Sequence, residues 1–368
     1  MEGMVSDALP EEWSIIRSWL PADLDERARE HGFFQRARGL TDAECWLRII
    51  LMHVGGGLSL GQAAVRAREL GLAEISGVAL FKRLRNAEAW LQNLCQYTLA
   101  EQQKRLGPQP WPKGYRLRII DATDVQEPGS TGSTWRIHYS IQVPELVCDH
   151  YEVTDQSGGE KLGRFVFERG ELVLVDRGYS HRAGAAHVLE SGAALVLRWN
   201  PATFPLEDLR ARPFKLLDHL RRLPAKGARE WPVQFQWQGK SYRLRLCAMR
   251  KSRTATERAR RKSLRKAQRN ATRPDPQAIE LAEYILVLTS LAPEFGVEQV
   301  LELYRSRWQI ELAFKRLKSL LAAGHVPKTK DRSARAWMQA KLLTALLLDR
   351  LLLEAKAFSP WGYNLSKP

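Results

Sequence analysis

Hydrophobic positions follow a helical period in the first part of the chain. Up to residue 110, apolar residues recur three and four positions apart, as in CWLRIILMHV and VALFKRLRNAEAWLQNL, which is the spacing of amphipathic helices. Gly55–Gly57 predict the end of one helix, and Gly71 predicts the end of another. Ser59 and Ser76 are predicted N-caps. We therefore expect a helical N-terminal domain over residues 1–110.

From residue 111 the pattern changes to short apolar runs separated by turn residues. Five runs predict strands: RLRIID (116–121), WRIHYSIQV (135–143), HYEVTD (150–155), ELVLVD (171–176) and AALVLRW (193–199). ELVLVD has no polar face, which is typical of a strand covered on both sides. Asp121 and Asp176 end two of the runs, and open α/β sheets place their chemistry at the carboxyl ends of central strands. Residues 111–199 are therefore predicted to form the first part of an α/β core.

The second half of the chain alternates and then returns to a helical period. Alternation in PVQFQWQ, SYRLRLCAM and YILVLTSL predicts a β-rich insertion over residues 200–292. Residues 293–368 are predicted to complete the core with two long helices, at 298–322 and 332–354. The longest apolar run, Leu342–Leu353, contains Asp349 and Arg350 and is shorter than the roughly 18 residues of a bilayer span. It predicts a buried helix.

The charge of the chain points to an anionic partner. Lys and Arg number 57 against 41 Asp and Glu, a net charge of +16. Nucleic acid is the usual partner for such a charge, and no lipidation motif or basic amphipathic anchor favours the alternative of a membrane surface. Residues 250–273 hold eleven Lys or Arg and one Glu. This basic segment is either a solvated surface helix or loop, or an arm that binds phosphates without reading bases.

The N-terminal helices have the spacing of a helix-turn-helix unit. Helix pairs of this kind also occur in plain bundles, so the structural and DNA-binding interpretations both remain open. Basic residues favour DNA binding; they are Arg66, Arg68, Lys82, Arg83 and Arg85.

Cysteine spacing and the N-terminal residues bear on the cellular compartment. The four cysteines lie far apart without a C-x-x-C pair, and we expect reduced core thiols at Cys45, Cys95, Cys148 and Cys247. MEGMVSDALPEEW carries acids where a secretory signal would carry a basic segment. We therefore expect the protein to stay in the cytoplasm.

One predicted helix carries four functional side chains in a line. At about 100° per residue, Tyr304, Arg307, Glu311 and Lys318 share a stripe of roughly 60°. The predicted buried face consists of Ile310, Ala313, Phe314, Leu317, Leu320 and Leu321. The non-functional interpretation of the stripe is a solvent-exposed helix face with salt bridges. A carboxylate between cations also suits a group that meets a metal while its neighbours hold phosphates.

Glu311 completes a set of three candidate carboxylates with Asp121 and Asp176. Three carboxylates are the minimum set for holding two divalent cations about 3.5–4 Å apart and driving in-line attack on a phosphodiester. Asp124 would replace Asp121 if the strand ended later, whereas Asp149 and Asp155 are expected to be turn or edge residues.

Histidine and tryptophan residues compete less strongly for functional roles. His138 and His150 are expected to be hydrogen-bonded structural residues of flanking strands. Four tryptophans are expected in the core, namely Trp135, Trp231, Trp237 and Trp308. A pocket for a flipped base would need one of them, and the sequence does not say which.

The spacing of the stripe resembles a known signature. Two residues separate Tyr304 from Arg307, three separate Arg307 from Glu311, and six separate Glu311 from Lys318. This resembles the Tyr-Arg-Glu-Lys signature of the DDE transposases of bacterial insertion sequences, in the family conventionally numbered four. DAT at 121–123 and LVDRGY at 174–179 resemble the family's two aspartate motifs, although the first usually has Gly in second place.

The resemblance implies a fold and a set of site residues. It implies a ribonuclease H-like core with a β-rich insertion between the second aspartate and the glutamate, for which the 135 residues from 176 to 311 leave room. Two Mg²⁺ ions, for which Mn²⁺ would substitute, would be bound by Asp121, Asp176 and Glu311. DNA near the scissile phosphate would be contacted by Tyr304, Arg307 and Lys318. Arg177, next to the second aspartate, either touches DNA or forms a packing salt bridge.

The implied activity is that of a transposase acting on double-stranded DNA. Such an enzyme binds inverted-repeat ends as a homodimer in a synaptic complex, cleaves them, and transfers the 3′-hydroxyl ends into target DNA. The resemblance places it in the bacterial cytoplasm, at the nucleoid. Two alternatives remain: a ribonuclease H-like nuclease that cuts without joining, and a transposase-derived DNA-binding protein. A membrane-surface protein would leave the carboxylates unexplained.

Overall fold

The structure is a computed structural model that describes residues 8–34, 42–105, 112, 114–129, 134–224, 227–273, 275–327 and 331–357. The chain divides into two compact units. The first, here called the helical unit, comprises residues 1–109, 122–158 and 312–368. The second, here called the sheet unit, comprises residues 110–121 and 159–311. The chain passes between them inside a strand, at 121/122, and inside a helix, at 311/312.

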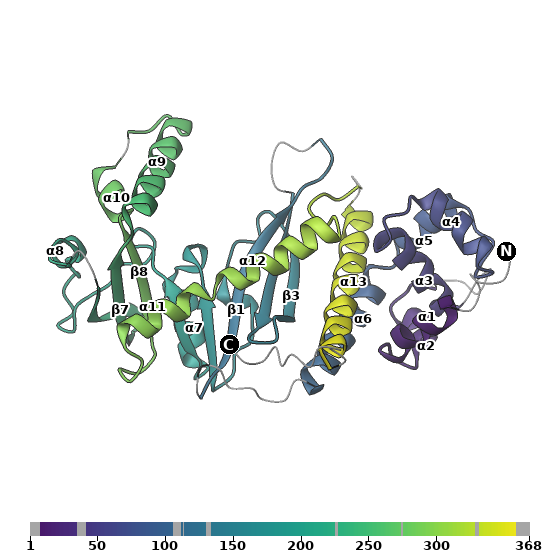
Figure 1. Cartoon of the computed structure of the whole chain (residues 1–368), viewed down its shortest axis with the longest axis horizontal. Coiled ribbons are helices and arrows are strands. Elements are labelled where there is room, and N and C mark those ends of the chain that lie inside the picture. Colours follow the sequence, from purple (N-terminus) through teal and green to yellow (C-terminus); the bar gives the residue numbers. More distant parts are fainter. Residues whose placement is uncertain are drawn as a thin grey trace. The chain divides into compact units, whose positions relative to one another are not determined.

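Most of the described helices of the helical unit come from the N-terminal third of the chain (Figure 1). They are α1 (Ala8–Ser18), α2 (Leu24–Glu30), α3 (Ala43–Val54), α4 (Leu60–Glu69), α5 (Gly77–Leu84) and α6 (Glu88–Arg105). The predicted caps are confirmed, because Ser59 accepts the Gln62 N–H and Ser76 accepts the Ala79 N–H. Helix α3 ends at Val54, as the following glycines predict.

The C-terminal helix α13 (Asp331–Ala357) packs against α6 and α3 and against strand β3 (Val147–Asp155). Strand β2 (Trp135–Gln142) runs antiparallel to β3, with a register shift between Ser140 and Ile141. Figure 1 shows α6 and α13 side by side in this unit. No helix in the described ranges is long and apolar enough to cross a membrane.

Asp349 of α13 is a carboxyl whose burial gives stability a pH dependence. Its side chain is 12% exposed and lies 3.2 Å from the Arg316 guanidinium, and burial raises its pKa to about 6. The native protein therefore binds a proton more tightly than the unfolded chain, whose pKa is about 3.9. Stability from this group is present below about pH 4 and is lost as the pH rises through 6.

We expect Asp349→Asn to remove this pH dependence. Between pH 4 and 6 the wild type should lose roughly 2 kcal/mol more of its free energy of unfolding than the variant, measured by urea titration. Asp331→Asn is the matched control, because Asp331 lies exposed on the same helix. An equal change with pH in wild type and Asp349→Asn would contradict the assignment.

The sheet unit consists of strands with helices between them. The strands are β1 (Arg116–Val125, its first half), β4 (Glu171–Val175), β5 (Ala194–Arg198), β6 (Ala228–Trp237), β7 (Lys240–Arg250) and β8 (Tyr284–Thr289). The helices are α7 (Arg182–Glu190), α8 (Leu216–Arg221), α9 (Arg253–Arg269), α10 (Pro276–Leu281) and α11 (Val297–Arg305), followed by the start of α12 (Trp308–Lys315). All five strands predicted between residues 116 and 199 are present, and two of them, β2 and β3, belong to the helical unit.

Strand pairing makes the protein a mixed α/β structure. β1, β4 and β5 are parallel, and β8, β7 and β6 continue antiparallel from β5. The strand order among the described residues is β3-β2-β1-β4-β5-β8-β7-β6. The strands of residues 200–292 therefore extend the same sheet, with β8 paired directly to β5.

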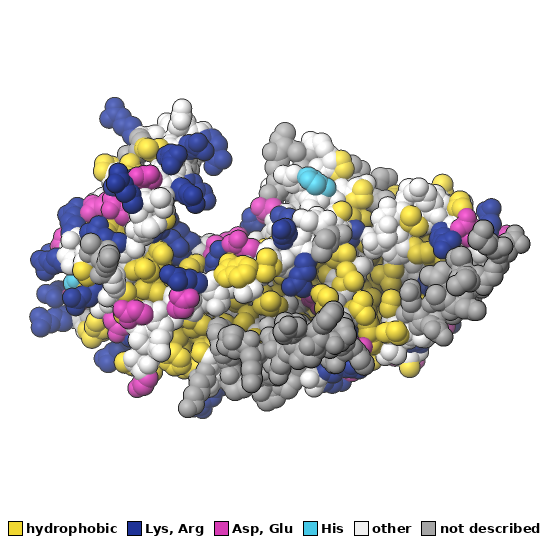
Figure 2. Space-filling model, viewed as in Figure 1, with side chains coloured by type: hydrophobic (Ala, Val, Ile, Leu, Met, Phe, Trp, Pro, Cys, Tyr) yellow, Lys and Arg dark blue, Asp and Glu magenta, His cyan; other side chains and the backbone are white. Residues whose placement is uncertain are grey.

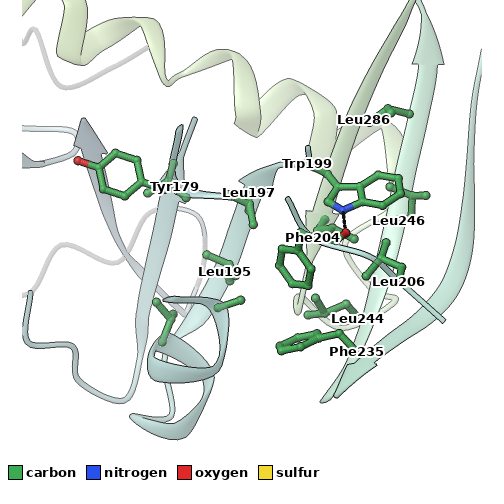
Figure 3. Packing of buried hydrophobic residues seen from close by; sticks show 14 of the residues in the cluster. Tyr179, Leu195, Leu197, Trp199, Phe204, Leu206, Phe235, Leu244, Leu246 and Leu286 are labelled. Atoms are coloured by element: carbon green, nitrogen blue, oxygen red, sulfur yellow. Dashed lines mark hydrogen bonds between the residues drawn. The ribbon is translucent and has the colours of Figure 1, made fainter. Parts of the chain in front are cut away.

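A buried apolar cluster fixes the strand ends of the sheet unit (Figure 3). Phe204 and Phe235 meet edge to face with ring centroids 4.9 Å apart, and Trp199 Nε1 donates a 2.8 Å hydrogen bond to the Phe204 carbonyl. Tyr179, in the turn after β4, belongs to the same cluster. The core therefore holds the turns that follow β4 and β5.

The single helix predicted over residues 298–322 is wrong, because the segment is divided. Helix α11 ends at Arg305, α12 begins at Trp308, and a π-helical turn covers Arg316–Leu320. Hydrogen bonds spanning three residues, from Arg307 N to Tyr304 O and from Ile310 N to Arg307 O, tighten the chain at the interruption. The rotation of 100° per residue that defined the predicted stripe therefore does not hold across the whole segment.

The predicted apolar face of this segment is confirmed, whereas one aromatic prediction fails. Buried side chains are Ile310, Ala313, Phe314, Leu317 and Leu321, and the Leu320 side chain lies outside the described residues. Trp135 is buried, as predicted, while Trp231 and Trp237 are partly buried against the core. Trp308 is 50% exposed and is not a core residue, because it begins α12 after the interruption and faces away from the apolar side.

The cysteines are mostly core residues, as predicted. Cys95, Cys148 and Cys247 are buried, and burial raises the pKa of each thiol. Cys45 is only partly buried, which corrects the prediction for this residue. It follows Asp42, which caps α3 and accepts from the Cys45 N–H, so its position is set by the helix end and not by the core.

Candidate active site

Asp121 and Asp176 follow neighbouring residues of two parallel strands. The pairing of β1 with β4 ends at Ile120 opposite Val175, so the next residue of each strand is an aspartate. Because parallel strands present their carboxyl ends at one edge of a sheet, the two carboxylates lie at the same edge. Strand β1 does not end at Asp121 as predicted; it continues to Val125, beyond the point where its pairing with β4 stops.

Asp176 shapes the turn that follows β4. Its Oδ1 accepts a 2.7 Å hydrogen bond from the Gly178 N–H and caps the 3₁₀ turn Arg177–Tyr179. Position 178 has no room for a side chain, since a Cβ there would collide with the Glu160 carboxylate and lie 3.2 Å from Asp176 Oδ1. Glu160 therefore brings a further carboxylate to this turn.

Arg307 joins two of the three predicted carboxylates. Its Nη1 donates to Asp121 Oδ2 at 3.2 Å, and its Nη2 donates to Glu311 Oε1 at 2.5 Å. The side chains of Asp121 and Arg307 are 15% and 22% exposed, whereas that of Glu311 is 60% exposed. Burial lowers the pKa of Arg307, but Tyr304, Glu311 and Asp121 raise it above its usual value, so the guanidinium stays charged.

Tyr304 lies on the same side of the site, at the end of α11. The Arg198 guanidinium carbon lies 5.9 Å from the centroid of its ring, within the range of a cation–π contact. Burial raises the pKa of Tyr304 against the opposing charges of Arg198 and Arg307, and the nearby Asp176 raises it further. The phenol is therefore protonated at neutral pH and can donate a hydrogen bond.

Arg177 forms no ion pair with the carboxylates of the described ranges. Its Nη2 donates at 2.7 Å to the side-chain oxygen of Asn200, which follows β5 by two residues. Partial burial and the charge of Arg198 lower its pKa. The packing salt bridge that the sequence left open is thus not what holds this residue.

Lys318 is the one predicted site residue that belongs to the helical unit. Asp121, Asp176, Arg177, Tyr304, Arg307 and Glu311 all belong to the sheet unit. Lys318 lies exposed in the π-helical turn of the helical unit, with its Cγ 3.6 Å from the position of a Cβ on Gly324.

The competing residues have structural partners. Asp124 forms an ion pair with Arg136 at 3.1 Å, and Asp155 accepts from Ser157 in the turn that ends β3. Asp149 lies in β3, the first strand in the sheet order, and is buried. His138 Nε2 lies 3.1 Å from Thr154 Oγ1, as expected for a structural histidine.

The three carboxylates are of a type that binds hard divalent cations, but they do not converge on one point. Among the described residues, no three Asp, Glu, His or Cys side chains converge closely enough to hold a metal ion. The Arg307 guanidinium lies between Asp121 and Glu311, so a cation already bridges two of the three carboxylates. Carboxylate oxygens are the ligands that Mg²⁺ prefers. These residues would fit a magnesium site if Arg307 moved away from the two carboxylates.

Arg198 and Glu160 are the neighbours that sequence reasoning missed. Arg198 ends β5, the parallel neighbour of β4, and the rule that places chemistry at the carboxyl ends of such strands could have found it. Glu160 lies in a loop before a short 3₁₀ turn, and no periodic signal marks it.

Comparisons with known proteins define the class to which this chain belongs. Residues 112–348 match the family model described as the transposase DDE domain. This range includes Asp121, Asp176 and Glu311. The chain belongs to the family of DDE-domain transposases.

Two full-length relatives come from insertion sequences of Escherichia coli. The putative transposase InsL for insertion sequence element IS186A, of strain K12, is 34% identical over 364 residues, which cover 95% of this chain and 96% of the relative. The transposase for insertion sequence element IS421 is 33% identical over 365 residues, with the same coverage.

A solved structure, the piggyBac transposase synaptic complex with hairpin DNA, aligns with 93% of this chain and 74% of that chain. Its TM-score is 0.47 at 10% identity.

Proposed function

We propose that this protein is an insertion-sequence transposase that cleaves DNA at inverted-repeat ends and joins the 3′-hydroxyl ends to target DNA. We assign it to the family numbered four, with Tyr304, Arg307, Glu311 and Lys318 as its signature. The single observation that carries the proposal is the Arg307 bridge. Arg307 contacts both Asp121, which is 186 positions away in sequence, and Glu311. Asp121 lies at the same sheet edge as Asp176.

In this proposal Asp121, Asp176 and Glu311 hold two divalent cations, Mg²⁺ or Mn²⁺. When bound, such ions would supply Lewis acidity to the attacking water or 3′-hydroxyl and to the leaving oxygen. The protein supplies position and charge. Arg307 turns from the carboxylates to the phosphate, where its planar fork of N–H donors matches phosphate oxygens. The Tyr304 hydroxyl donates to the same DNA strand, and Arg177 and Lys318 neutralise neighbouring phosphates.

The other parts of the chain receive roles that follow from this one. The core is proposed to be ribonuclease H-like, interrupted by residues 200–292, and the helices of residues 1–110 to bind transposon ends. Strand transfer joins two ends to one target, so we propose that two copies of the chain act in a synaptic complex at the bacterial nucleoid. The net charge of +16 supports a DNA partner.

The experiment that tests this function separates cutting from joining. Labelled duplex carrying the terminal inverted repeat is incubated with the protein, Mg²⁺ and supercoiled plasmid, and products are followed as cut ends and as label joined to plasmid. The proposal expects both. Cut ends that never join, even when supplied with a free 3′-hydroxyl, would identify a nuclease. Salt-dependent binding without cutting in Mg²⁺ or Mn²⁺ would identify a DNA-binding protein.

A further inference from the structure

A hollow of ≈ 840 Å³ lies in the sheet unit, lined by α9, α10 and the ends of β5, β7 and β8. Five cationic side chains from separate elements line it: Arg177, Arg198, Lys251, Lys262 and Arg273. The acidic residue of its lining is Asp275, which caps α10 by accepting the Gln277 N–H. We call this lined space the basic hollow. Figure 2 shows Lys and Arg side chains gathered over α9.

The cations of the basic hollow are not neutralised by carboxylates in the part of the chain that the structure describes. Arg177 donates to Asn200, and Lys251 Nζ donates to the Ala282 carbonyl. The nearby acids pair with other cations. Glu283 forms ion pairs with Arg250 and Arg260, and Glu280 pairs with Arg221. Ion pairing thus neutralises the surroundings and leaves the hollow positive.

The positive charges are close enough to oppose one another. Burial, followed by the charges of Arg198 and Arg177, lowers the pKa of Lys251 to about 8. Bringing like charges together in this way is unfavourable in the empty site, and an anion bound among them would relieve the repulsion.

Helix α9 leaves space for a ligand along this side. Its lining residues Ala259, Ser263 and Ala267 are small, and Lys262 stands among them. The volume falls in the range of roughly 300–1,000 Å³ that is usual for pockets holding one drug-sized molecule. It can take a few nucleotides of one strand but not a double helix.

The basic hollow adjoins the candidate active site through two of its own residues. Arg177 directly follows Asp176, and Arg198 lies over the Tyr304 ring. A strand lying in the hollow would therefore continue from the carboxylates towards α9. We propose that the basic hollow binds the sugar–phosphate backbone of one DNA strand next to the bond that is cut; this inference rests on the proposed function.

The test compares two pairs of substitutions on and beside one helix. Lys262→Gln with Arg273→Gln removes two charges from the hollow, whereas Arg261→Gln with Arg265→Gln removes two exposed charges of α9 that do not line it. Binding of fluorescein-labelled (dT)₂₀ and of a 30-base-pair duplex is measured by anisotropy in EDTA, over a range of salt concentrations. Thermal unfolding confirms that both variants fold.

We expect the hollow variant to bind (dT)₂₀ about tenfold more weakly, with its salt-dependence slope reduced by about 1.4, since each phosphate contact contributes about 0.7 on single strands. The affinity of the control variant for (dT)₂₀ should change by less than about threefold. Equal losses in both variants, or a loss confined to the duplex, would overturn the hollow as the site. If the wild type bound neither probe, the proposed function would be contradicted as well. If the wild type bound and cut DNA and the hollow variant bound DNA equally well, only this inference would be overturned.

Discussion

Replacement of Glu311 by Gln should lower DNA cleavage on the order of 10³-fold and leave DNA binding nearly unchanged. The amide keeps the shape of the side chain and can still meet Arg307, but it loses the negative charge that a divalent cation needs. Asp121→Asn and Asp176→Asn should have the same effect. Cleavage of end-labelled duplex in Mg²⁺ measures the loss, and anisotropy in EDTA measures binding.

Asp124→Asn is the matched control for these three substitutions. Asp124 lies on the same strand as Asp121 and forms a partly exposed ion pair with Arg136, of a kind that contributes little to stability. Its loss should leave cleavage within about twofold. If Asp124→Asn abolished cleavage and Asp121→Asn did not, the first carboxylate would be assigned to the wrong residue.

Arg307→Gln should separate metal binding from catalysis. In the free protein the guanidinium is bound to Asp121 and Glu311, so a metal ion that bound these carboxylates would have to displace it. Its removal should make Mn²⁺ bind the DNA-free protein several-fold more tightly, because two carboxylates lose their counter-charge. Cleavage should nevertheless fall on the order of 10²-fold, because the bidentate phosphate contact is lost.

Calorimetric titration with Mn²⁺ and the cleavage assay measure these two effects separately. Arg307→Lys is the control, since it keeps the charge without the planar fork, and it should lie between wild type and Arg307→Gln in both measurements. Weaker Mn²⁺ binding by Arg307→Gln would show that the guanidinium supports the metal site instead of competing with it.

Local patterns predicted the elements that depend on local interactions. Alternating and continuous apolar runs located β1–β5, and Ser59 and Ser76 were identified as caps because the serine hydroxyl reaches an N–H three residues ahead. The positions of Asp121 and Asp176 after apolar runs also came from the sequence. That both runs pair in parallel, with their aspartates at one edge, required the register of β1 and β4.

Features that depend on distant contacts were not predictable. The division between α11 and α12 accompanies the contact of Arg307 with Asp121, a residue of another element far away in sequence. The exposure of Trp308 follows from that division. Likewise, the basic segment could have been a loop or a helix. Its helix α9 pairs Arg260 with Glu283, while Lys262 faces the hollow, and periodicity alone cannot separate the two roles.

The central claim is that Asp121 is a ligand of the metal that cuts DNA, and a change of ligand atom tests it most directly. Cleavage of the inverted-repeat duplex is measured for wild type and Asp121→Cys in Mg²⁺ and in Mn²⁺. Because a thiolate is a poor ligand for Mg²⁺ and a better one for transition metals, the variant should be inactive in Mg²⁺ and regain cleavage in Mn²⁺. Cleavage by Asp121→Cys in Mg²⁺ at the wild-type rate would contradict the account.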